Sequence, residues 1–132
     1  MPRTIPLALS SHAKPIDSFA EASALERALK EVVRGEVRFD RGSRALYATD
    51  GSNYRQVPIG LVVPRDADDV VAAVAACRRY GAPVLPRGAG TSLSGGAVPD
   101  PRGVVLSLAK FRRILAIDPL TRTATVQSGV RN

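Results

Sequence analysis

Residues 59–96 read IGLVVPRDADDVVAAVAACRRYGAPVLPRGAGTSLSGG, and this stretch decides the fold. It opens with a short apolar run at 59–64 that is rich in β-branched residues, a composition typical of a buried strand. A helical pattern follows, and then a second short apolar run at 82–86. Strand, helix and strand within so few residues predict a βαβ crossover, in which the two strands are parallel.

The helix between these strands has recognisable ends. Asp66 is in the position of an N-cap, and Gly81 is in the position of a C-cap. Two further aspartates stand in the first turn, where the helix dipole favours carboxylates. The spacing of apolar residues predicts one buried face, made by Ala67, Val70, Val71, Val74 and Cys77.

The flanking segments contain weaker signals. Ser23 opens a capping-box pattern that predicts a helix ending near Val33, and a short helix is expected through residues 44–47. After the glycine-rich segment, GVVLSLAKF predicts a strand that ends near Lys110. RRILAID and RTATVQSG predict two more strands, which the turn at 118–121 joins into a hairpin with one buried face.

The glycine-rich segment PRGAGTSLSGG, residues 86–96, is the strongest functional signal. Its glycines allow unusual backbone angles and let a ligand approach the main-chain N–H groups, while its hydroxyl side chains add donors. Successive N–H groups in one concavity form an anion site, for which a phosphate is the natural occupant. The alternative interpretation is a glycine-rich connection without a ligand.

Neither of the two common phosphate motifs fits this segment. A Walker loop ends in Gly-Lys-Ser/Thr, and residues 86–96 contain no lysine. The dinucleotide fingerprint G-x-G-x-x-G lacks its third glycine here because Leu93 stands in that position, and the following AVPDPRG is a poor helix start.

Composition excludes several classes of protein. The single cysteine, Cys77, rules out an internal disulfide framework and a cysteine-rich metal site, and its apolar surroundings predict a buried side chain. The formal charge is +7, but the arginines are dispersed without interleaved aromatic residues, so no nucleic-acid partner is expected. The apolar run near the N-terminus is too short for a signal peptide or membrane span, which makes the cytoplasm the expected compartment.

Three parts of the chain are expected. Residues 1–16 resemble a flexible leader, residues 17–54 form a helical segment, and residues 55–132 form the first part of a larger domain. The chain stops at QSGVRN without a closing element, which predicts a domain that continues beyond it. The fold class is therefore α+β: a helical leader, a βαβ unit and additional strands that include the hairpin.

The stretch VVPRDADDVVAAVAACRRYGAPVLPRGAGTSLSGGAV resembles the first half of the FAD-binding domain in the vanillyl-alcohol oxidase (PCMH-type) flavoprotein superfamily. Within it, YATDGSNYRQVP upstream and LAKFRRILAIDPLTRTATVQSGVRN downstream are similar to the glycolate oxidase and D-lactate dehydrogenase branch. The segment GEVRFDRGSRALYATD is similar to that of the long members, which carry a C-terminal iron–sulfur module. The resemblance covers residues 35–132.

The resemblance implies a site for FAD. The loop from Arg87 to Gly96 would wrap the pyrophosphate, Val62 to Pro64 would border the adenine, and Ser128 to Val130 would approach the ribityl chain or flavin. Asp50, Ser52 and Tyr54 match a family signature, and equally suit hydrogen bonds that fix a loop. The implied cofactor-binding residues are Pro86, Arg87, Gly88, Ala89, Gly90, Thr91, Ser92, Leu93, Ser94, Gly95, Gly96, Val63, Pro64, Gly129 and Val130.

The family chemistry is oxidation of a small 2-hydroxy acid such as D-lactate or glycolate, by hydride transfer to the flavin. No catalytic residue and no metal ligand are expected in this chain, and an iron–sulfur cluster would belong only to a C-terminal part. FAD attachment is expected to be non-covalent because residues 86–96 contain no histidine. Peripheral membrane association of the full-length enzyme and self-association of this chain are compatible with the sequence. The alternative is a stand-alone, non-enzymatic module for anions, nucleotides or interaction.

Overall fold

The computed structural model describes residues 19–131. The leader expected at 1–16 lies outside the described residues. The elements, in chain order, are α1 (Phe19–Val32), β1 (Glu36–Arg38), α2 (Arg41–Leu46), β2 (Gly60–Val63), α3 (Ala67–Arg79), β3 (Val84–Arg87), β4 (Val104–Ser107), β5 (Ile114–Asp118) and β6 (Thr123–Val126).

Four strands form one sheet in the order β1-β2-β4-β3, with β4 parallel to both of its neighbours and β1 antiparallel to β2. The predicted parallel relation of β2 and β3 is thereby confirmed, and the glycine-rich segment follows the carboxyl end of β3. The sequence did not indicate that β4 inserts between them. Residues 36–38, within the segment expected to be helical, add the antiparallel edge strand.

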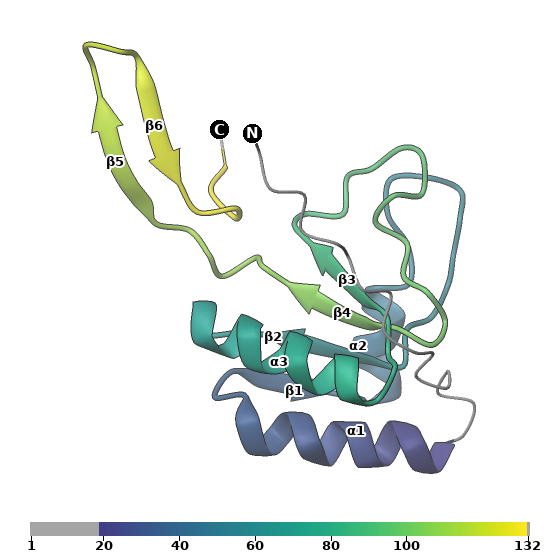
Figure 1. The fold of residues 1–132 in the computed structure, drawn as a ribbon. Helices are drawn as coiled ribbons and strands as arrows, with labels where there is room; N and C mark the ends of the chain where they lie inside the picture. The colour runs from purple at the N-terminus through teal and green to yellow at the C-terminus, as the bar shows by residue number, and fades with distance from the viewer. Residues whose placement is uncertain (1–18, 132) are drawn as a thin grey trace, which may run out of the picture.

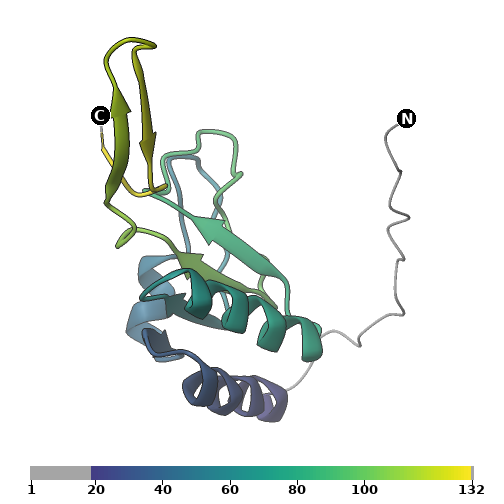
Figure 2. The same cartoon turned by 60° about the vertical axis from the view of Figure 1, so that its left-hand side comes forward.

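The sheet has a core on each face. Figures 1 and 2 show α1 and α3 lying together on one face. On that side the buried side chains of Leu25 and Leu29 from α1 meet Val62, Val104 and Leu106 from the sheet. Because strand side chains alternate between faces, the intervening Leu61, Val63 and Val105 form a second, smaller cluster on the opposite face.

The caps of α3 match the prediction. The Asp66 side chain accepts a hydrogen bond from the backbone of Asp69, which satisfies an N–H group at the helix start. At the other end Gly81 has φ of 65°, and its N–H donates to the carbonyl of Arg78. The N–H of Ala82 donates to the carbonyl of Cys77, which completes a Schellman motif.

The predicted buried face of α3 is wrong by part of a turn. Val71 and Val74 are 70% and 42% exposed, whereas Ala73 and Ala76 are buried beside Cys77. The close approach of α3 to the sheet and to α1 selects the small alanines and leaves the larger valines outside. Cys77 is buried as predicted, and this burial raises the pKa of its thiol to about 11.

Two boundaries also differ from the prediction. The first helix begins at Phe19, so Ser23 lies inside it and is not its cap; the good helix formers before Ser23 extend the helix. Strand β4 ends at Ser107 and not near Lys110, because the chain turns there with the N–H of Phe111 donating to the carbonyl of Leu108.

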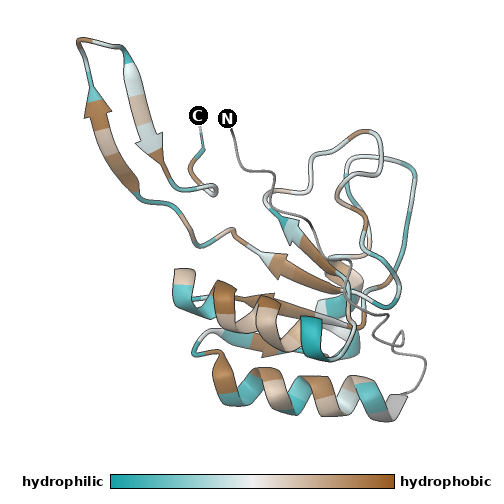
Figure 3. Ribbon diagram, in the orientation of Figure 1, coloured by the Kyte–Doolittle hydropathy of each residue, from teal (hydrophilic) through white to brown (hydrophobic). Residues whose placement is uncertain are grey.

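The hairpin of β5 and β6 forms as predicted, but the expected buried face is absent. Every residue of both strands is exposed, and Figure 1 shows the hairpin standing away from the four-stranded sheet. Figure 3 shows that β5 is as hydrophobic as the core strands, although nothing in the described chain covers it. The strand pairing also skips Leu115, which places an irregularity in β5.

Among the helices within residues 19–131, none is both long enough and apolar enough to cross a membrane.

Candidate functional site

The glycine-rich segment packs against a second loop from earlier in the chain. Figures 1 and 2 show the loop between β3 and β4 beside the loop between α2 and β2. At their contact, a Cβ built on Gly51 would lie 3.1 Å from the carbonyl oxygens of both Thr91 and Ser92. Gly51 therefore lets the two backbones meet, which the sequence pattern of the glycine-rich segment did not reveal.

Arg87, the last residue of β3, points into this contact. Its side chain is 8% exposed, and its guanidinium donates to the backbone carbonyls of Tyr47 (3.2 Å), Thr49 (2.7 Å) and Ala97 (3.1 Å). The guanidinium carbon also lies 5.2 Å from the centre of the Tyr47 ring. Arg87 therefore does not project into solvent.

Asp50 ties the same two loops together from the other side. Its carboxylate accepts hydrogen bonds from the backbone and hydroxyl of Ser52 and from the backbone N–H of Ala97. These hydrogen bonds, led by that of the Ser52 hydroxyl, lower the pKa of Asp50, and the charge of Arg87 acts in the same direction. The sequence allowed either a family signature or hydrogen bonds that fix a loop, and the structure contains such loop-fixing hydrogen bonds. Tyr54 is 65% exposed, and only its backbone N–H bonds to Ser52.

The N–H groups of the glycine-rich segment fall into two groups. In its second half, the Ser92 hydroxyl accepts hydrogen bonds from the N–H groups of Ser94 and Gly96. In its first half, the N–H groups of Ala89, Gly90 and Thr91 have no hydrogen-bond partner among residues 19–131. Unpaired N–H groups at the end of a parallel strand are suitable donors for an anion.

The start of this segment opens onto a pocket of about 130 Å³. The C-terminal segment forms its other wall, so that parts of the chain some 40 positions apart meet there. The lining residues are Gly88, Ala89, Ala109, Arg112, Ser128, Gly129, Val130 and Arg131. A Cβ built on Gly88 would have no atom within 4 Å, so the place of its missing side chain is open.

Two arginines give this pocket positive charge. Arg112 is held by a 2.7 Å hydrogen bond from its Nε to the carbonyl of Ala109, and neither Arg112 nor Arg131 is ion-paired with another residue in the described part of the chain. Sequence reasoning missed both, since they stand among many dispersed arginines and only the fold brings them beside Gly88.

The opposite wall depends on a close backbone approach at Gly129. A Cβ there would lie 2.7 Å from the carbonyl oxygen of Leu108 and 2.8 Å from that of Phe111. The N–H of Gly129 donates to the same Phe111 carbonyl at 2.8 Å. A glycine at this position is therefore required for the C-terminal segment to close over the turn after β4.

The remaining residues expected at the site are distributed around this pocket. Pro64 is fully buried, and Val63 lines an adjacent hollow of about 270 Å³ that shares Ala109 and Arg112 with the pocket. Leu93 is 82% exposed and lies outside both hollows. The structure thus brings Gly88 and Ala89 together with Gly129 and Val130, and leaves the rest of the glycine-rich segment, residues 90–96, outside the pocket wall.

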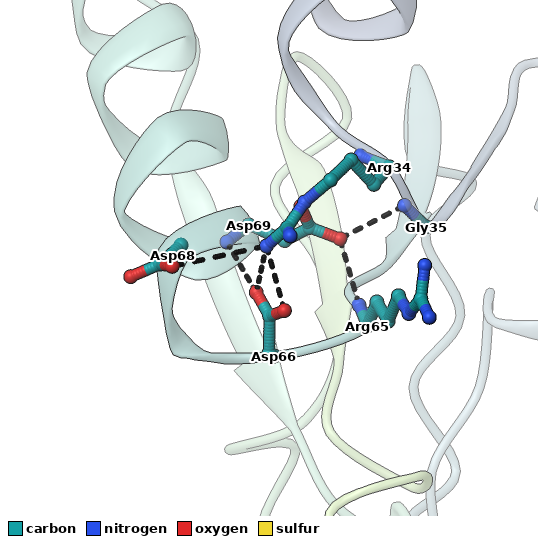
Figure 4. Close-up of polar contacts among 6 residues, drawn as sticks. All are labelled: Arg34, Gly35, Arg65, Asp66, Asp68 and Asp69. Atoms are coloured by element: carbon teal, nitrogen blue, oxygen red, sulfur yellow. Dashed lines mark hydrogen bonds and ion pairs between the residues drawn. The ribbon is translucent and has the colours of Figure 1, made fainter.

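A buried carboxylate fixes the turn between β2 and α3. Figure 4 shows the Asp69 carboxylate receiving the backbone N–H groups of Gly35 and Arg65, each at 2.8 Å. It also accepts the backbone N–H and Nε of Arg34, whose Nη2 reaches both oxygens of Asp66 at 2.6 Å. Burial acts to raise the pKa of Asp69, but the hydrogen bonds from Arg65 and Arg34 outweigh it, so the pKa lies below its ordinary value.

Comparison with known proteins identifies the family to which the chain belongs. The sequence model of a family described as "FAD binding domain" matches residues 58–132, more than half of the chain. The chain belongs to this family. The match includes the glycine-rich segment and both walls of the pocket, so Gly88, Arg112 and Arg131 all lie within the matched residues.

The curated relatives are longer proteins. The chain is 51% identical over 87 residues to the glycolate oxidase subunit GlcD of Escherichia coli K12, which covers 65% of this chain and 17% of that protein. It is 33% identical over 116 residues to a probable mitochondrial D-lactate dehydrogenase of Danio rerio, covering 84% of this chain and 23% of that protein. The chain therefore spans about a fifth of the length of these relatives.

Solved structures agree with the fold. A p-cresol methylhydroxylase structure superimposes with a TM-score of 0.74 at 23% identity, covering 86% of this chain and 23% of that chain. An alkyldihydroxyacetonephosphate synthase structure superimposes with a TM-score of 0.70 at 20% identity, covering 92% of this chain and 24% of that chain. The expected vanillyl-alcohol oxidase-type, α+β fold is thereby confirmed.

Proposed function

We propose that this chain supplies the pyrophosphate site for FAD in a flavin-dependent dehydrogenase that oxidises a small 2-hydroxy acid such as D-lactate or glycolate. The observation that carries the proposal is the pocket in which the open backbone of Gly88 and Ala89 faces Ser128 to Val130 beside two unpaired arginines. The names of the relatives, glycolate oxidase subunit and D-lactate dehydrogenase, support the substrate class.

The residues of the pocket fit an anionic cofactor in three ways. The unpaired backbone N–H of Ala89 offers a neutral donor, Arg112 and Arg131 offer charge, and the missing side chain of Gly88 leaves room for close approach. Bound FAD would supply the acceptor for the hydride that leaves the substrate α-carbon. The task of this chain is to hold and orient the cofactor, non-covalently, since residues 86–96 contain no histidine.

The cellular compartment that we propose follows from the sequence. We place the protein in the cytoplasm, with peripheral membrane association open to the full-length enzyme.

We expect no turnover of D-lactate or glycolate by these 132 residues alone, because catalysis requires the flavin ring to be held and aimed at the substrate carbon. A dye-reduction assay with added FAD tests this, and reduction that depends on substrate and survives gel filtration would contradict it.

A titration of the full chain with FAD tests the site. We expect weak, saturable binding that ADP, which shares the pyrophosphate, competes for better than riboflavin does. Arg131→Glu should weaken this binding at least tenfold, because it reverses a charge beside the pocket. Arg79→Glu, an exposed change on α3 away from the pocket, is the matched control and should leave it unchanged. Absence of binding at millimolar FAD, or equal effects of the two reversals, would refute the proposed site.

A further inference from the structure

The contacts of Arg87 differ from those of a phosphate ligand. Its guanidinium is buried and its N–H groups are directed at three backbone carbonyls, two from the segment after α2 and one from Ala97. We propose that Arg87 is a positioning residue that clamps both ends of the glycine-rich segment, and that Gly90 is a glycine because of this clamp and not because of a ligand. The part of the proposal that concerns FAD rests on the function proposed above.

The clamp acts on both ends of the segment at once. Arg87 stands at its beginning and holds the carbonyl of Ala97 at its end, while Asp50 holds the N–H of the same residue at 3.1 Å. The peptide groups around Ala97 are therefore fixed by a cation on one side and an anion on the other. Tyr47 and Thr49 provide the fixed base to which Arg87 attaches.

The planar shape of the guanidinium is essential to this arrangement. Its N–H groups diverge in a rigid fork, so one side chain can reach carbonyls on two different loops while it lies over the Tyr47 ring. A lysine keeps the charge but presents a compact ammonium group, which does not reproduce the fork. Charge alone is thus insufficient for the clamp, whereas charge is what a phosphate contact mainly needs.

The geometry at Gly90 shows what the clamp demands of the segment. Gly90 has φ of 71°, and a Cβ there would lie 2.2 Å from Nη2 and 2.6 Å from Cζ of Arg87. The guanidinium thus occupies the place of the missing side chain. Gly88, two residues earlier, has an ordinary φ and open space at the same position. The two glycines consequently serve different purposes, although the sequence presents them as one motif.

Thermal unfolding of the full chain without FAD tests the clamp directly. Gly90→Ala should lower Tm by about 5 °C or more, because the new Cβ meets Arg87 in a strained backbone conformation. The matched control Gly88→Ala should change Tm by less than about 2 °C. Equal losses for the two glycine variants would overturn the proposal.

A double-mutant cycle supplies the specific signature. In Arg87→Met the fork is gone, so adding Gly90→Ala should cost clearly less than it does in the unchanged chain, leaving only the strain of the positive φ. Strict additivity of the two changes would show that Gly90 does not depend on Arg87, and would also overturn the proposal. If Arg87→Met does not fold, Arg87→Lys, which also lacks the fork, takes its place in the cycle.

FAD titration then separates positioning from direct contact. Arg87→Lys should weaken FAD binding at least tenfold, as Arg87→Met does, because neither variant forms the clamp. Near-normal binding by Arg87→Lys with loss only in Arg87→Met would indicate a charge contact with the cofactor, and would refute the positioning role. If the unchanged chain binds no FAD, the proposed function fails, while the result of the unfolding cycle still stands.

Discussion

At the scale of single residues, buried polar groups determine how the loops around the pocket are held. Asp69 is 1% exposed, yet it is ionised and accepts backbone N–H groups from Arg34, Gly35 and Arg65. Gly35 fits there only because it lacks a side chain, since a Cβ would lie 2.2 Å from the carbonyl oxygen of Val63. One carboxylate thus joins the end of α1, the start of β1 and the turn that follows β2.

Asp69→Asn should destabilise the chain by about 2–4 kcal/mol at neutral pH, because an amide NH₂ would replace an oxygen that faces buried N–H donors. The folded-state pKa of Asp69 lies below the ordinary 3.8, so its stabilising effect is complete above that pH and is lost as the pH falls through the folded-state pKa. Urea unfolding of both proteins between pH 7 and pH 2 measures the difference, which should shrink only below about pH 4.

The control for this prediction is Asp68→Asn in the same helical turn. Its side chain is 94% exposed and lies 3.8 Å from Arg34, so the loss should stay below about 1 kcal/mol. A cost for Asp68→Asn equal to that for Asp69→Asn would mean that general charge in the first turn, and not the buried network, stabilises the junction.

At the scale of elements, α3 shows how packing overrides a hydrophobic pattern. Apolar residues surround most of this helix, so the pattern alone does not say which stripe faces the sheet. The structure buries the stripe that contains Ala73 and Ala76 and exposes Val71 and Val74. Small side chains there let α3 approach both the sheet and α1.

Two matched substitutions on α3 test this orientation. Ala73→Leu should destabilise the chain by about 1–3 kcal/mol, because Ala73 is 2% exposed and the larger side chain overpacks the core. Ala75→Leu, two residues along on the exposed side, should change stability by less than about 0.5 kcal/mol. Denaturant unfolding measures both, and the opposite order would show that α3 is rotated away from this orientation.

At the scale of the whole molecule, the described chain has two unequal parts. The sheet has buried side chains on both faces, whereas the hairpin projects from it with Ile114, Leu115 and Ile117 each more than half exposed (Figure 2). Exposed apolar strands with free edges tend to pair with other chains.

We therefore expect the chain to self-associate through the hairpin. Ile117→Thr should lower the associated fraction in sedimentation velocity at micromolar concentration, while changing the free energy of unfolding by less than about 0.5 kcal/mol because Ile117 is already 67% exposed. Val71→Thr, at a residue that is 70% exposed on α3, is the matched control. Dissociation by Val71→Thr with no effect of Ile117→Thr would place the contact on the helix.

The sequence alone determined the features that depend on local chemistry. The two caps of α3, the parallel strands around it, the hairpin turn and the glycine-rich segment after β3 each have a signature within a few residues, because caps and turns are decided by neighbouring backbone and side-chain groups. The family resemblance rested on the order of these same signatures. Their functional assignment, residue by residue, stays a prediction.

The tertiary structure alone decided what depends on contacts between distant residues. The insertion of β4 between β2 and β3, the buried stripe of α3 and the meeting of Gly88 with Arg112 and Gly129 have no local signature, since each results from packing between segments far apart in the chain. Arg87 shows the difference most clearly. In the sequence it is a cation beside a loop that is expected to bind phosphate. In the fold its buried guanidinium donates to three backbone carbonyls, because a buried charge must be hydrogen-bonded within the protein.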